Sequence, residues 1–350
     1  MNKTKKPRIA ELDVLKGATI LTVVLCHSGA YRHIDMNQFP VYVMLTEWIK
    51  SWNMQTFFMV SGLLFAKAKP KPFGEFFKSK WERLAVPYLV LSFITLFVKC
   101  MVPWLFHRPS DPILLSIYSI LCYGKWYWFI YTLFVLYMVF FFFKERLTVL
   151  SACLVILVMM VVKVFPTPHI GFLKIHQASY FGGFFLMGFI MNTYYPKIRE
   201  WMCKWWFIPV NLVIFALGFR YCFNESFVNH WAEPDGYSQS LCGRFVYYWI
   251  LPVTLSLAFW SMCIFLTKNK TATETMKYCG EYSLQFYLFN GFAIGISREI
   301  LMRVLHTNNP YLLIACLFST VCIVTILMVE ITRRLPKLSY YFGYGKSSKT

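Results

Sequence analysis

A lysine and a histidine lie eleven residues apart in one apolar segment near the start of the chain: Lys16 and His27, in LDVLKGATILTVVLCHSGAY. Eleven helical steps of about 100° return to within about 20° of the starting direction, so both side chains would share one helix face, about 16 Å apart along its axis. Ionisable groups persist inside membrane helices mainly where they face a protein interior or a pathway. The alternative is that Lys16 extends to the membrane surface while His27 hydrogen-bonds to a neighbouring helix.

His27 has a side chain suited to general-base chemistry, because an unperturbed imidazole titrates near neutral pH. It falls near the outer end of its predicted helix, within reach of an external hydroxyl. In a hairpin with the next helix, Glu47 would lie at a similar depth and is the candidate carboxylate that orients the imidazole. Lys50, three residues on, could instead simply neutralise Glu47. Asp13 could pair with Lys16 in the same way.

Two further cations, Lys80 and Arg83, are three residues apart and would lie on one face of one helical turn. Such a pair suits a ligand that carries several phosphates. Four nearby lysines add to the local positive field, although they are better explained as signals of membrane topology. These lysines are Lys67, Lys69, Lys71 and Lys78.

The elements that must position these side chains are membrane helices. Of the 350 residues, 58% are hydrophobic, 20% are aromatic and only 15% are charged, which excludes an ordinary soluble domain. Ten apolar runs approach the length of about 20 residues that a spanning helix needs, and 112–123 is expected to be re-entrant or interfacial. The ten runs are 13–31, 42–65, 84–106, 126–143, 147–164, 177–195, 205–221, 246–266, 281–300 and 310–332.

This pattern predicts an all-α, multi-pass bundle of about ten transmembrane helices. It forms a single domain over 1–350, with short cytoplasmic tails at 1–12 and 333–350. Alternate loops carry 23 of the 35 basic residues, so these loops and both termini are expected to be cytoplasmic. The net charge of +19 then faces anionic inner-leaflet lipids and predicts no nucleic-acid partner. The basic loops are 1–12, 66–86, 144–147, 196–205, 268–280 and 333–350.

The eleven cysteines are scattered, without a CxxC pair or a Cys/His cluster at metal-ligand spacing, so no metal site is expected. Cys222 and Cys242 differ from the rest because they flank the longest external loop. An oxidising compartment would allow these two to form a disulfide.

Three motifs, in order, resemble those of the acyltransferase family 3 proteins. The first is a basic residue followed by ten others and a histidine, at 16–27, with lysine where arginine is more usual. The second is Phe-Phe-x-x-Ser-Gly at 57–62, and the third is Lys-x-x-Arg ahead of a proline, at 80–87. Ser61 and Gly62 in the second motif are small residues, which let membrane helices approach closely.

Two later segments extend the resemblance over nearly the whole chain. KWYWFIYTLF at 125–134 looks like the family's Trp-Phe-Leu segment, and CGEYSLQFYLFN at 279–290 resembles its Gly-x-x-Ser-x-x-x-Tyr-Leu-x-His segment. Asn290 stands where histidine is usual, so no catalytic role is assigned to it.

The resemblance implies an enzyme of the plasma membrane, the inner membrane in a bacterium. It would move an acyl group from cytoplasmic acyl-CoA to a hydroxyl of an extracytoplasmic glycan or lipid-linked glycan. Acyl-CoA, most simply acetyl-CoA, is a co-substrate, and no cofactor is held permanently. Lys80 and Arg83 would bind the phosphates of coenzyme A, Lys16 would line the path of its pantetheine arm, and His27 would act on the acceptor.

Two alternatives stay open at this point. His27 could act as a general base in direct transfer, or it could carry the acyl group covalently. The chain could also be a transporter or flippase of a glycan or lipid-linked precursor, which typically shows two sequence-related halves. No such internal repeat is seen in this sequence.

Overall fold

The described part of the chain is built of helices. The computed structural model describes residues 10–29, 38–102, 111–165, 172–222, 240–304 and 309–344, and within these ranges it contains no β-strand. The all-α prediction is therefore confirmed for this part of the chain. Its α-helices are α1 (Ala10–His27), α2 (Pro40–Lys50), α3 (Asn53–Lys67), α4 (Phe73–Lys80), α5 (Val86–Met101), α6 (Ile113–Tyr123), α7 (Trp128–Phe143), α8 (Val149–Val164), α9 (Ile175–Met202), α10 (Phe207–Cys222), α11 (Leu241–Phe245), α12 (Leu251–Leu266), α13 (Lys270–Glu281), α14 (Ser283–Val304), α15 (Pro310–Arg334) and α16 (Pro336–Tyr341).

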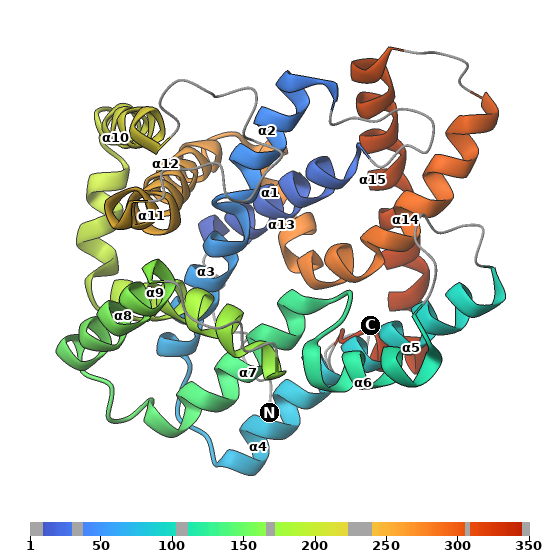
Figure 1. Cartoon of the computed structure of the whole chain (residues 1–350), viewed down its shortest axis with the longest axis horizontal. Coiled ribbons are helices and arrows are strands. Elements are labelled where there is room, and N and C mark those ends of the chain that lie inside the picture. Colours follow the sequence, from blue (N-terminus) through green and yellow to red (C-terminus); the bar gives the residue numbers. More distant parts are fainter. Residues whose placement is uncertain are drawn as a thin grey trace.

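Helices α1 and α3 run through the middle of the molecule (Figure 1). Helices α8 to α12 lie on one side of this pair, and α14 and α15 lie on the other. Two π-helical turns, η2 (Trp81–Ala85) and η5 (Val246–Ile250), join α4 to α5 and α11 to α12, and a short 3₁₀ turn, η4 (Phe172–Lys174), precedes α9.

All ten apolar runs are largely helical, but the number of membrane spans stays a prediction. Three described helical stretches could each cross a membrane by length and composition, namely Phe73–Met101, Leu241–Leu266 and Pro310–Arg334. Two bent pairs raise this number to five if each pair counts as one span. They are α6 with α7, bent by 41°, and α9 with α10, bent by 98°. These helices support a membrane protein without confirming a count of ten.

Two predicted boundaries differ from the structure. The run 42–65 was expected to be one helix, but α2 ends at Lys50 and α3 begins at Asn53. The stretch 268–280, expected to be a loop, forms α13. The side chain of Asn269 caps this helix by accepting a hydrogen bond from the backbone N–H of Ala272, at 3.0 Å.

Glycines set the closest helix contacts. A Cβ atom on Gly62 would collide with the backbone carbonyl of Phe185, and one on Gly188 would collide with that of Met59, so α3 and α9 touch through their backbones. The small residue at the end of the Phe-Phe-x-x-Ser-Gly motif thus has the packing role expected of it. Helices α1 and α13 cross in the same way.

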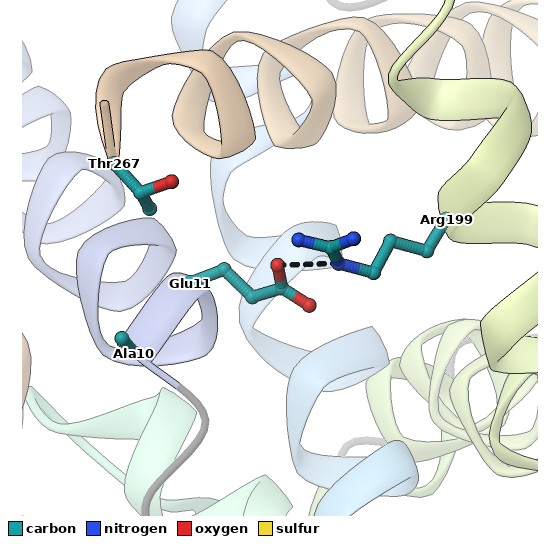
Figure 2. A pocket seen from close by; sticks show the side chains of 4 residues that line it. All are labelled: Ala10, Glu11, Arg199 and Thr267. Carbon is teal, nitrogen blue, oxygen red and sulfur yellow. Dashed lines mark hydrogen bonds and ion pairs between the residues drawn. The ribbon is translucent and has the colours of Figure 1, made fainter.

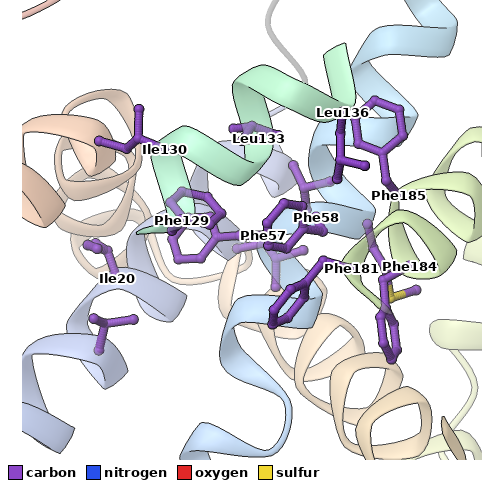
Figure 3. Packing of buried hydrophobic residues seen from close by; sticks show 14 of the residues in the cluster. Ile20, Phe57, Phe58, Phe129, Ile130, Leu133, Leu136, Phe181, Phe184 and Phe185 are labelled. Atoms are coloured by element: carbon purple, nitrogen blue, oxygen red, sulfur yellow. The ribbon is translucent and has the colours of Figure 1, made fainter. Parts of the chain in front are cut away.

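A layer of aromatic rings fills the centre of the bundle between α1, α3, α7 and α9 (Figure 3). Phe58 is fully buried and stacks on Phe181 with ring centroids 4.6 Å apart. It also meets Phe129 edge to face at 5.1 Å. Phe57 and Ile20 extend the layer toward α1.

Helix ends gather at two opposite faces of the bundle. At the first, which we call the Glu11 end, the start of α1 meets the last turn of α9 through Glu11 and Arg199. At the second, the His27 end, Cys26 lies against the carbonyl of Thr46, at 3.7 Å. The first turn of α3 lies at this His27 end, because α3 follows α2 directly and runs parallel to α9.

The predicted disulfide between Cys222 and Cys242 is not formed, because both residues are free thiols. Cys222 is buried and its Sγ donates to the carbonyl oxygen of Gly243 at 3.5 Å, whereas Cys242 is exposed. The two side chains therefore lie in different surroundings although their helices are adjacent.

Candidate functional site

Helix α1 holds Lys16 and His27 in one unbroken run of eighteen residues. Its helical geometry therefore puts the two side chains on one face, as the spacing predicted. The ammonium of Lys16 lies 2.6 Å from the carboxylate of Asp13. The sequence had suggested this ion pair as one possibility. It balances the charge of Lys16 within one helical turn. His27 is the last residue of α1, and its imidazole is exposed.

Glu47 does not contact His27. Its carboxylate binds the ammonium of Lys50 at 2.7 Å, and within the described residues no hydrogen bond joins it to the imidazole. Lys50 is close enough to His27 to act on it electrostatically. Glu47 was considered either as the carboxylate that orients His27 or as the partner of Lys50. The structure contains the ion pair with Lys50.

Lys80 and Ser61, from two different motifs, meet on a tyrosine that the sequence did not single out. The ammonium of Lys80 lies over the ring of Tyr137, 3.5 Å from its centroid. Ser61 on α3 is a side-chain hydrogen-bond partner of the same tyrosine. Phe65 and Phe76 pack against the Tyr137 ring as well. Tyr137 on α7 thus connects the Phe-Phe-x-x-Ser-Gly motif with the Lys-x-x-Arg motif.

A cluster of three cations surrounds this tyrosine at the Glu11 end of the bundle. Lys80, Arg83 and Lys144 are close enough that the charges of Arg83 and Lys144 both act on Lys80. Among the described residues, no carboxylate forms an ion pair with any of the three. Lys144 follows α7 and donates to the carbonyl of Ala68. A cluster of unpaired cations is favourable only beside an anion or water, so it can bind a polyanion.

The backbone around Arg83 is unusual for a membrane helix. Arg83 lies in the π-helical turn η2, which widens the otherwise continuous helix from α4 to α5. Such turns occur frequently at functional sites, because the extra residue redirects neighbouring side chains. The side chain of Arg83 is exposed, and a Cβ on Gly343 would lie 2.7 Å from its carbonyl oxygen. The C-terminal segment therefore packs beside the cation cluster.

A pocket of about 340 Å³ opens at the start of α1 and was missed by sequence reasoning (Figure 2). Ala10, Glu11, Arg199 and Thr267 line it. Glu11 is only 7% exposed, and each of its carboxylate oxygens has a partner. Arg199 Nε lies 2.7 Å from one oxygen, and the hydroxyl of Tyr195 donates to the other at 2.6 Å.

This buried carboxylate fixes α1 to α9 at the Glu11 end. In the sequence, Glu11 is marked only by its position just before the segment that carries Lys16 and His27. As for metals, no group of three or more His, Cys, Asp or Glu side chains within the described ranges could hold an ion.

The structure therefore separates two kinds of chemistry. Lys80 and Arg83 lie together with Lys144 at one end of the bundle, whereas His27 lies at the other end, beyond the aromatic layer. Lys16 lies on α1 between the two ends. The end with the cation cluster can bind a polyanion, and the end with the exposed imidazole can accept a proton.

A comparison with protein-family models matches residues 9–329 to an acyltransferase domain, that of acyltransferase family 3. No curated protein matches the chain, and no solved structure does.

Proposed function

Because this chain belongs to acyltransferase family 3, we propose that it moves an acyl group from acyl-CoA on the cytoplasmic side to a hydroxyl of an extracytoplasmic glycan. The acyltransferase class follows from the family, and the donor, acceptor and direction are our proposal. The observation that carries it is the placement, at opposite ends of one helical bundle, of an exposed histidine and of a cation cluster that has no ion pair among the described residues. We place the protein in the plasma membrane, the inner membrane in a bacterium.

The donor would bind at the Glu11 end. Coenzyme A carries several phosphate groups, and Lys80 and Arg83 supply the charge-assisted bonds that hold phosphates. Lys144 adds a third cation that the sequence did not identify. The Lys80 ammonium lies over the Tyr137 ring and would leave this ring to bind a phosphate. The pantetheine arm then extends along α1 past Lys16 toward His27.

The transfer step would occur at the His27 end. His27 accepts the proton of the acceptor hydroxyl as its oxygen attacks the thioester carbonyl. A new carbon–oxygen ester bond forms, the carbon–sulfur bond breaks, and coenzyme A leaves as a thiolate that takes up the proton. Lys50, at the end of α2, is close enough to act on the imidazole electrostatically. Attack by His27 itself, followed by transfer of the acyl group to the glycan, uses the same geometry.

The proposal is tested on the envelope glycans of the cell. Mass spectrometry would compare acyl esters on these glycans in cells with the protein, without it, and with the gene restored. We expect one class of glycan to lose an acyl ester, most simply acetyl, and to regain it on restoration. Identical glycan spectra in all three strains, with the protein present in the membrane, would contradict the proposal.

A further inference from the structure

A second cationic cluster lies at the His27 end, where the membrane topology signal does not explain it. Lys163, in the last turn of α8, has its ammonium 4.2 Å from the ring centroid of Tyr248 and 5.1 Å from that of Tyr180. Arg244 on α11 donates to the carbonyl of Val164, the residue after Lys163, at 3.4 Å, so α11 contacts the last turn of α8. Among the described residues, no carboxylate forms an ion pair with Lys163 or Arg244.

The buried amide of Gln55 is linked to this cluster through Tyr180. Gln55 in the first turn of α3 is 5% exposed and donates through Nε2 to the hydroxyl of Tyr180 at 3.1 Å. That hydroxyl in turn donates to the carbonyl of Tyr248 at 3.1 Å. The other atom of the Gln55 amide, Oε1, has no hydrogen-bond partner among the described residues, and neither has Oε1 of Gln177, one helical turn before Tyr180.

These side chains have the chemistry of a site for a charged sugar. The apolar face of a pyranose ring packs on aromatic rings, and its hydroxyl groups can donate to amide oxygens such as those of Gln55 and Gln177. A carboxylate on the sugar binds lysine and arginine together through charge-assisted bonds. Buried polar atoms without partners are uncommon, and a ligand hydroxyl would supply what these two oxygens need.

The cluster also lies at the end of the bundle that our function assigns to the acceptor. Gln55 lies in the first turn of α3, which follows α2 directly, and Lys50 at the end of α2 acts on His27. We propose that Lys163, Arg244 and Tyr248 form an acceptor subsite that binds an acidic sugar residue of the glycan. This inference rests on the proposed function, since it names the substrate class for the same transfer.

The test measures saccharide binding to the purified full-length protein in detergent, without acyl-CoA. The probes are a hyaluronan tetrasaccharide, which carries glucuronate carboxylates, and chitotetraose, a neutral chain of the same length. We expect the wild-type protein to bind the acidic probe at least about tenfold more tightly than the neutral one, with a preference that declines at high salt. Lys163→Gln should abolish the preference and Lys163→Arg should retain it.

Lys99→Gln is the matched control, because Lys99 also lies over an aromatic ring, that of Trp126, at 5.2 Å. This variant should keep the preference for the acidic probe. Equal binding of the two probes, no binding of either, or an unchanged preference in a Lys163→Gln protein of wild-type thermal stability would overturn the proposal. Acyl-CoA binding is measured on the same samples. Loss of acyl-CoA binding by the wild-type protein would count against the proposed function, whereas loss of the saccharide preference alone would count against this subsite.

Discussion

At the scale of single residues, His27 and the cation cluster can be tested separately because they lie at opposite ends of the bundle. His27→Ala should leave acyl-CoA affinity nearly intact and reduce acyl transfer by about 10²-fold or more, since the imidazole acts only on the acceptor hydroxyl. Isothermal titration with acyl-CoA and a transfer assay on one purified variant measure both quantities.

A purely structural histidine would behave differently. Losing a buried hydrogen bond would lower stability by about 1–3 kcal/mol and depress binding and transfer together. His176→Ala, a histidine near the start of α9, controls for nonspecific damage. A folded His27→Ala protein that transfers acyl groups at the wild-type rate would refute the mechanism.

Arg83 belongs to the donor side. Arg83→Ala should weaken acyl-CoA binding by about 1.5–3 kcal/mol, or roughly 10- to 150-fold, because a charge-assisted bond to a phosphate is lost. The measurement is the dissociation constant in detergent. Lys78→Ala is the control, because Lys78 is an exposed cation near the same turn but outside the motif, and its affinity should change little. Equal effects of the two substitutions would reduce Arg83 to a topology signal.

The candidate residues were partly readable from the sequence. Lys16, His27, Lys80 and Arg83 stand out because ionisable types recur at helical spacing within apolar segments. Tyr137 gave no such signal, since it lies in a helix rich in aromatic residues and its sequence does not distinguish it from its neighbours. Its role depends on which ring faces α3 and α4, and that is decided by tertiary packing.

At the scale of helices, the ion pair between Glu11 and Arg199 should be the main polar link between α1 and α9. Glu11→Gln should lower the unfolding free energy by about 1–3 kcal/mol, because the bonds from Arg199 and Tyr195 lose their charged partner in a buried place. This range already allows for solvent screening, since the Arg199 side chain is 45% exposed. Chemical denaturation of the purified protein measures the change.

A surface ion pair provides the comparison for Glu11. Glu274 pairs with Lys277 at 2.9 Å, and its side chain is 65% exposed. Glu274→Gln should change stability by less than about 0.5 kcal/mol. If the Glu11 variant is as stable as the Glu274 variant, the pair at the start of α1 does not hold the two helices together.

Helix α13 shows why one element was misassigned. Its sequence, KTATETMKYCGE, is polar and carries two lysines and two glutamates, so it has the composition of a loop between membrane spans. The capping asparagine at 269 was a local signal for a helix start. The contact that holds α13 in place could not be read from sequence. Gly17 meets the backbone of Met276, and Gly280 meets that of Asp13.

At the scale of the whole molecule, the orientation in the membrane makes a direct prediction. Two native cysteines are exposed at opposite ends, Cys242 at the His27 end and Cys203 after α9 at the Glu11 end. In an otherwise cysteine-free protein, a membrane-impermeant maleimide applied to intact cells should label Cys242 alone. Permeabilised cells should show both labelled. Labelling of Cys203 alone in intact cells would reverse the orientation and the proposed direction of transfer.

Composition and periodicity predicted the helical class and the position of nearly every long helix, because apolar runs must be buried in lipid or protein. They did not predict how helices bend and break. The bend between α9 and α10 is 98°. No local residue pattern predicts the size of this angle. The number of crossings does not follow from the sequence for the same reason.

The aromatic layer of Phe57, Phe58, Phe129 and Phe181 matters for the energetics of the cell. A protein that exposes cations and an imidazole to the two sides of a membrane risks becoming a leak for protons. Each elementary charge that crosses dissipates about 2.3 kcal/mol per 100 mV of membrane potential. The rings of Phe58, Phe129 and Phe181 pack face to face and edge to face, so the layer offers few hydrogen-bonding groups to a chain of water molecules. A hydrated proton finds few hydrogen-bond partners among such rings, so the layer would let the enzyme work without discharging the membrane.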